Sequence, residues 1–91
     1  MSDRVERYPN CSILSGGWEN GRGEAKENMT VEEAITYAIA NNYNCINFRT
    51  KRNPNTSIKY FYRRSYAYCK RKVDDARPDP DAVMTILIRP I

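Results

Sequence analysis

The clearest pattern of apolar and polar positions along the chain lies between Thr30 and Phe48. Apolar residues repeat there with the 3.6-residue period of one helix face, at Val31, Ala34, Ile35, Ala38 and Ile39. Thr30 and Glu33 have the spacing of a capping box, which satisfies amides at the start of a helix. Asn41 and Asn42 tolerate the left-handed conformation that ends many helices. We therefore expect a short helix after Thr30 whose apolar stripe must be covered by a sheet.

Three segments are expected to form strands: 44–49, 57–62 and 82–88. In the first, Ile46 and Phe48 point to one side, as in a strand with one better-buried face. The last segment is apolar with little alternation and ends before Pro90. It predicts a strand that is covered on both sides, either central in the sheet or masked by a partner.

The segment 57–62 is rich in residues that favour strands, and we expect Ile58, Tyr60 and Tyr62 to share one face. Between it and 44–49, the stretch 51–56 holds Asn and Pro and predicts a turn. The two strands are therefore expected to form an antiparallel hairpin.

The stretch 65–73 is ambiguous. Tyr66 and Tyr68 continue a strand-like alternation, whereas a helix would place Tyr62, Tyr66 and Cys69 on one side. The aromatic content favours a strand.

The remaining segments are expected to be irregular or short. Residues 1–10 predict an N-terminal arm or edge segment interrupted by Pro9, and 11–15 a short strand. The stretch 16–28 holds all four glycines and predicts a loop, as does the proline- and aspartate-rich stretch 74–81.

These elements predict a single small α+β domain over residues 1–91, with one helix on one face of a mostly antiparallel sheet in the order β-α-β-β-(β)-β. A central helix followed by a cysteine-containing strand and an aromatic strand resembles the layout of PAN/apple-type modules. The disulfides that tether the helix in that family have no counterpart here. The resemblance is one of architecture alone. A small extracellular-type binding module is one alternative function class.

Composition indicates a soluble globular protein, with 41% hydrophobic and 29% charged residues. No apolar run approaches the length of a membrane span, and the N-terminal residues lack the apolar core of a signal peptide. We therefore expect an intracellular setting, which could be the cytoplasm, the nucleus or a virion.

The chain contains three cysteines and no histidine. Cys11, Cys45 and Cys69 are expected to be reduced thiols packed as small apolar groups. No zinc-ligand spacing and no nucleotide-binding motif is present, so we expect no metal and no cofactor. Because the usual catalytic base near neutral pH is absent, we expect no enzyme.

The positive charge is concentrated in one segment. The net charge is +4, yet residues 49–73 hold nine basic residues and no acid, which leaves six basic and eleven acidic residues elsewhere. Such asymmetry indicates a negatively charged partner. The expected partner-binding residues are Arg49, Lys51, Arg52, Lys59, Phe61, Arg63, Arg64, Tyr66, Tyr68, Lys70, Arg71 and Lys72.

Two further function classes follow from this segment. The first is a structural or interaction subunit of a larger assembly, which docks other protein subunits through the basic-aromatic hairpin and the apolar last strand. The alternative is a nucleic-acid-binding domain, in which the same cations contact phosphates and the aromatic rings stack on bases of a single strand or RNA.

Overall fold

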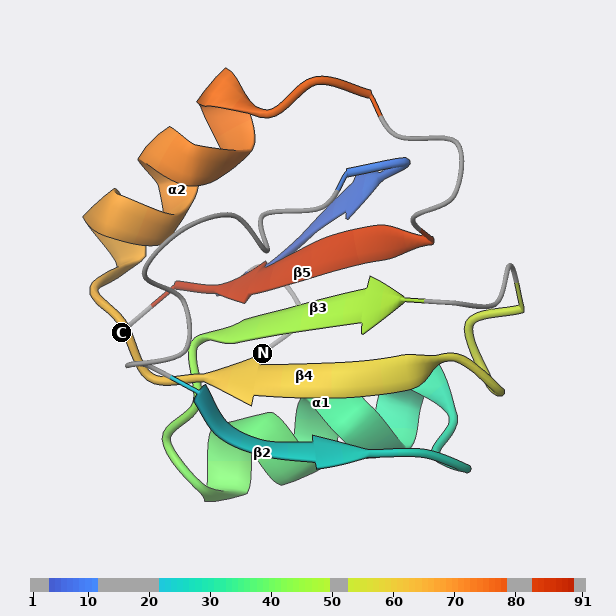
Figure 1. The fold of residues 1–91 in the computed structure, drawn as a ribbon. Helices are drawn as coiled ribbons and strands as arrows, with labels where there is room; N and C mark the ends of the chain where they lie inside the picture. The colour runs from blue at the N-terminus through green and yellow to red at the C-terminus, as the bar shows by residue number, and fades with distance from the viewer. Residues whose placement is uncertain (1–3, 12–21, 50–52, 79–82, 90–91) are drawn as a thin grey trace.

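The computed structural model describes residues 4–11, 22–49, 53–78 and 83–89. It is a small α+β fold with two helices and five strands (Figure 1). The elements are β1 Val5–Pro9, β2 Arg22–Lys26, α1 Val31–Ala40, β3 Cys45–Arg49, β4 Ile58–Tyr62, α2 Tyr66–Asp75 and β5 Met84–Ile88.

The five strands form one sheet in the order β1-β5-β3-β4-β2, and every neighbouring pair is antiparallel. The predicted hairpin is confirmed, since Ile46 lies opposite Phe61 in the pairing of β3 with β4. Its described turn is closed by the Asn53 carbonyl oxygen, which accepts hydrogen bonds from the amides of Thr56 at 3.1 Å and Ser57 at 3.0 Å. The sheet edges are the short strands β1 and β2.

The predicted first helix is confirmed in its position and in its capping. The Thr30 hydroxyl accepts a hydrogen bond from the Glu33 amide at 3.1 Å, and the Glu33 carboxylate accepts one from the Thr30 amide at 2.8 Å. Asn41 caps the other end, and Asn42 has the positive φ of 62° that reverses the chain. The helix thus starts and stops where local side-chain chemistry directs it.

The apolar stripe of α1 covers one face of the sheet. Ala34, Ile35 and Ala38 are buried against strand residues that point to the same side. The buried members of this cluster from the strands and the loop after α1 are Tyr43, Ile46, Phe48, Phe61, Ile86 and Ile88. We refer to these residues and the buried α1 residues as the α1-side core.

The prediction of a strand at 65–73 is wrong, because this stretch forms α2. The Ser65 hydroxyl accepts a hydrogen bond from the Tyr68 amide and caps the helix. Cys69 and Val73, four residues apart, are buried against the sheet face opposite α1. The prediction of a single helix on one face is therefore also wrong, and Figure 1 shows the two helices on opposite sides of the sheet.

The α2-side core consists of Cys11, Cys45, Tyr62, Cys69, Val73 and Leu87, with tyrosines packed around it. It explains why both faces of β3 are buried, although one better-buried face was predicted. β5 is covered on both sides, as predicted, and its Thr85 hydroxyl donates to the Asn47 side-chain oxygen inside the sheet at 2.8 Å.

The two edge strands lie where an N-terminal arm or edge segment and a glycine-rich loop were predicted. Residues 5–9 of the expected arm form β1, which pairs with β5, and residues 22–26 of the expected glycine-rich loop form β2, which pairs with β4. Both are polar edge strands whose place is decided by backbone pairing rather than by alternating burial. Asp74 and Asp75 of the expected loop end α2 instead. The predictions for 12–21 and 79–82 lie outside the described residues.

Candidate functional site

The structure separates the twelve predicted partner-binding residues into four groups. Lys51 and Arg52 lie outside the described residues. Lys59 and Phe61 are fully buried on the α1 side of β4. Arg49 is half-buried at the end of β3. The others lie on α2 or on the connection that leads into it.

Lys59 was expected to bind a partner, but its side chain has no exposed surface. Its amine lies 5.6 Å from the centre of the Phe48 ring and has no hydrogen-bond partner among the described residues. Burial lowers the pKa of this amine and outweighs the negative charge of Glu33, which raises it. Lys59 therefore belongs to the interior of the fold rather than to a docking surface.

A row of half-buried side chains four residues apart runs from the connection before α2 along one flank of the helix. The Tyr68 ring lies between two cations, with the Arg64 guanidinium 4.5 Å and the Lys72 amine 5.6 Å from its centre. Arg71 is exposed beside them. We call Arg64, Tyr68, Arg71 and Lys72 the basic ridge. Because cations of the chain itself lie against the Tyr68 ring, that ring is already engaged within the protein.

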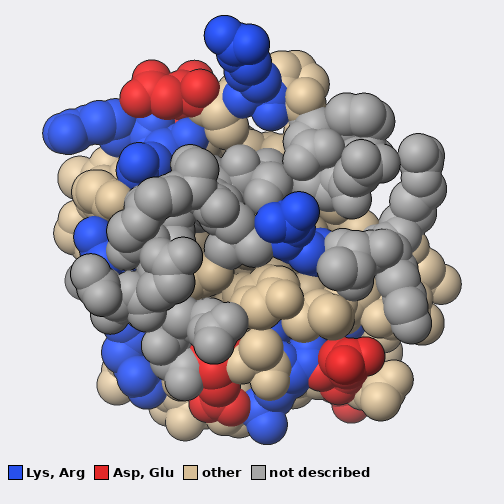
Figure 2. Space-filling model, viewed as in Figure 1, with Lys and Arg blue, Asp and Glu red and all other residues tan. Residues whose placement is uncertain are grey.

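Acidic residues stand at the far end of α2. The Lys70 amine forms an ion pair with Asp74 at 2.6 Å and lies 6.0 Å from the centre of the Tyr8 ring, so it points toward β1. The hydrogen bond to Asp74 raises the pKa of Lys70. Figure 2 shows basic side chains gathered over α2, with acidic ones beside them at its C-terminal end. The positive charge is therefore least compensated near the start of the helix.

Tyr66 belongs to a hydrogen-bonded cluster beside β1. The Glu6 carboxylate accepts from the hydroxyls of Tyr8 at 2.7 Å and Tyr66 at 2.5 Å, and it forms an ion pair with Arg89. Partial burial raises the pKa of Glu6, but the hydrogen bonds and the Arg89 charge outweigh it and lower the pKa below 4.5. The Tyr66 hydroxyl is thus committed to holding α2 against the edge of the sheet.

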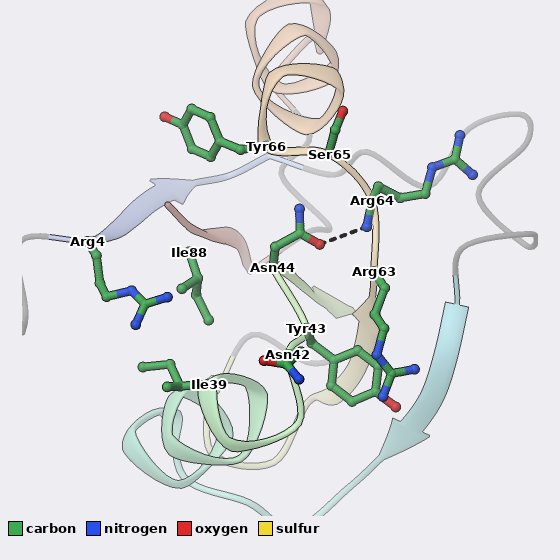
Figure 3. Close-up of a pocket in the computed structure, with 10 residues that line it drawn as sticks. All are labelled: Arg4, Ile39, Asn42, Tyr43, Asn44, Arg63, Arg64, Ser65, Tyr66 and Ile88. Atoms are coloured by element: carbon green, nitrogen blue, oxygen red, sulfur yellow. Dashed lines mark hydrogen bonds between the residues drawn. The ribbon is translucent and has the colours of Figure 1, made fainter. Parts of the chain in front are cut away.

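A pocket of about 420 Å³ opens at the N-terminal end of α2 (Figure 3). We call it the arginine pocket. It is lined by Arg4, Ile39, Asn42, Tyr43, Asn44, Arg63, Arg64, Ser65, Tyr66 and Ile88. Three of these side chains are cationic and none is acidic. Residues from five parts of the chain meet here, at one end of the strands. These parts are the end of α1, the start of β3, the start of α2, the end of β5 and the residue before β1.

Two arginines of the arginine pocket are held in place by backbone oxygens. Nε and Nη2 of Arg63 donate to the Asn41 carbonyl oxygen at 3.2 and 3.1 Å, and the guanidinium lies 4.1 Å from the centre of the Tyr43 ring. Nε of Arg4 donates to the Arg89 carbonyl oxygen at 3.1 Å. Neither arginine forms an ion pair with a carboxylate among the residues that the structure describes. Their positive charge is therefore available to an external anion.

The side chain of Asn44 fixes the connection between β4 and α2. Its oxygen accepts from the Arg64 amide at 2.7 Å, drawn dashed in Figure 3, and its nitrogen contacts the Cys69 sulfur at 3.9 Å. The sequence prediction missed Arg4, Asn42 and Asn44, because the basic segment was read as a continuous stretch of chain. Arg4 can be assigned to the pocket only once β1 is known to pair with β5.

The expectation that the last strand offers a docking edge is wrong. β5 is paired with β1 on one side and β3 on the other, and its residues from Thr85 to Ile88 are buried. A strand with two neighbours has no free backbone groups for strand addition.

The three cysteines are buried free thiols. Burial and the neighbouring Cys69 raise the pKa of Cys45, whereas a hydrogen bond from Cys45 lowers that of Cys69. Within the described ranges, no group of three cysteine, aspartate or glutamate residues could hold a metal ion. None of the helices in those ranges is long and apolar enough to cross a membrane.

Comparison with known proteins adds no family to this description. No protein-family model, no curated protein and no solved structure matches the chain.

Proposed function

We propose that this chain is a non-enzymatic interaction subunit that docks an acidic region of a partner protein through the basic ridge. The observation that carries the proposal is the position of the cations. Arg71 is exposed and Lys72 half-buried on α2, and Arg64 is half-buried on the connection before it. Neither Arg71 nor Lys72 forms an ion pair with an acid among the described residues. Helix cations that have no ion-pair partner among the described residues favour an acidic partner.

The state of the tyrosines favours a protein partner over nucleic acid. Single-strand binders stack bases on open aromatic faces. Here the Tyr68 ring carries two cations of the chain, and the Tyr66 hydroxyl is bonded to Glu6.

The proposal is tested by fluorescence anisotropy with two labelled probes, an oligo-glutamate peptide and a single-stranded oligonucleotide of equal charge. We expect the peptide to bind and its affinity to fall as salt is added, because exposed charges are screened. The double variant Arg71→Gln/Lys72→Gln is expected to weaken binding by about tenfold, which corresponds to about 0.7 kcal/mol for each exposed charge.

The matched control removes two cations away from α2. Arg7→Gln/Lys26→Gln deletes residues that are ion-paired with Glu32 and Glu24, and it is expected to leave peptide binding unchanged within about twofold. Absence of peptide binding at low salt would overturn the proposal. Tighter binding of the oligonucleotide than of the peptide would assign the surface to nucleic acid instead.

A further inference from the structure

The arginine pocket lies at the base of the basic ridge and shares Arg64 with it. Its two other cations, Arg4 and Arg63, stand on opposite sides of the hollow in Figure 3. The Arg4 guanidinium points toward the space between Ile39 and Ile88, and Arg63 lies beside Tyr43. The pocket thus combines separated positive charges with apolar walls.

The start of α2 adds to the positive potential of this pocket. Ser65 and Tyr66 line it, and the first turn of α2 contains no acidic residue. The first turn of α1 instead contains Glu32 and Glu33, and Glu33 closes the capping box. Because backbone amides at a helix N-terminus attract anions, the start of α2 strengthens the attraction that the arginines exert.

The apolar walls indicate what kind of anion fits. Ile88 is almost fully buried and Ile39 half-buried, and both line the pocket with Tyr43. A fully hydrated inorganic anion would gain nothing from such walls, whereas an anionic group on an apolar stem would bury that stem. The Nε atom of Arg4 is engaged with a carbonyl oxygen, which leaves its two terminal nitrogens for the two oxygens of a carboxylate.

We infer that the arginine pocket is the anchor site of the docking surface and takes an acidic side chain together with a neighbouring apolar side chain from an extended segment of the partner protein. The inference rests on the proposed function, since the basic ridge supplies the attraction along the rest of the segment. Arg4 binds the carboxylate, Arg63 lies on the opposite side of the pocket, and the half-buried Ile39 contacts the apolar group.

The test uses two labelled peptides of equal charge, one alternating glutamate with leucine and one alternating glutamate with serine. We expect the leucine peptide to bind about fivefold more tightly, as for burial of roughly one methylene group. Arg4→Gln is expected to weaken the leucine peptide by about tenfold, the effect of losing one charge-assisted hydrogen-bonded contact. Arg7→Gln, at an exposed arginine of β1 outside the pocket, is the matched control and is expected to change neither peptide.

A second variant guards against a loss of folding in Arg4→Gln. Asn42→Asp places a negative charge at an exposed rim position whose positive φ aspartate tolerates, and it is expected to weaken the leucine peptide to a similar degree. Circular dichroism checks that each variant is folded.

The outcomes separate this inference from the proposed function. If both peptides bind equally and neither pocket variant matters, while Arg71→Gln/Lys72→Gln weakens both, the basic ridge is the docking surface and the pocket inference is overturned. If neither peptide binds the unaltered chain at low salt, both proposals are overturned.

Discussion

The two helices lie on opposite faces of one sheet and are built by different chemistry. α1 buries Ala34, Ile35 and Ala38 on a broad hydrocarbon surface. α2 buries only Cys69 and Val73 among its residues, and its Tyr66 hydroxyl donates to Glu6 of β1. The hydrophobic effect therefore secures the α1 side to a greater extent than the α2 side.

The N-termini of the two helices also differ in their chemistry. α1 has a complete capping box and two glutamates in its first turn, so its N-terminus is compensated within the chain. α2 has a serine cap and no acid in its first turn, and Arg63 and Arg64 precede it. The N-terminus of α1 is thus compensated by acids of its own first turn, whereas that of α2 has none there.

The largest expected effect comes from shortening one buried side chain under each helix. Ile35→Ala should lower the free energy of unfolding by about 2–4 kcal/mol through lost burial and a cavity in the α1-side core. Val73→Ala should lower it by about 1–2 kcal/mol, because less apolar surface is removed. Urea unfolding measures both. A larger loss for Val73→Ala would contradict the comparison.

The next effect is a gain in stability on the α1 side. Lys59→Met replaces a fully buried amine that lacks a described hydrogen-bond partner, and it should raise the free energy of unfolding by about 1–2 kcal/mol at neutral pH. Urea unfolding of the variant and the unaltered chain measures the gain.

The stability gain of Lys59→Met is expected to depend on pH. Since the folded pKa of Lys59 is lowered, the unfolded chain binds the proton more readily, and the penalty for burial is present below the folded pKa. The advantage of Lys59→Met should shrink as pH rises through the folded pKa toward 10.5, the ordinary pKa of this amine. An advantage that grows with pH over this range would show that the amine is stabilised in its charged form.

The smallest expected effects concern the caps. Thr30→Ala removes one member of the capping box and should cost about 1 kcal/mol. Ser65→Ala removes a single hydroxyl acceptor without a reciprocal bond and should cost about 0.5 kcal/mol. Urea unfolding at low temperature resolves the difference. Equal costs would mean that the reciprocal bond of Glu33 adds nothing to α1.

These contrasts also explain how far the sequence predicts the fold. The stripe and capping box of α1 act within a few residues, so its start and end could be read directly. The alternation of Tyr66 and Tyr68 favoured a strand, yet the burial of Cys69 and Val73 and the cap at Ser65 decide for a helix. Covering the sheet face formed by Cys45, Tyr62 and Leu87 is a tertiary effect that local propensity does not carry.

The candidate site was predicted only in part for a similar reason. Arg63, Arg64 and the basic residues of α2 are neighbours in sequence and could be recognised as a group. Arg4 reaches the arginine pocket through the pairing of β1 with β5, a contact between the two ends of the chain. The burial of Lys59 was not predicted, because it depends on packing within the fold rather than on its neighbours in sequence.

The most direct test of the division between the helices is a map of amide chemical-shift changes on titration with oligo-glutamate. The account predicts changes along α2 from Ser65 to Lys72 and around Arg4 and Arg63, with the exposed residues Glu32 and Thr36 of α1 unaffected. Changes centred on the exposed side of α1, or spread evenly over both helices, would contradict it.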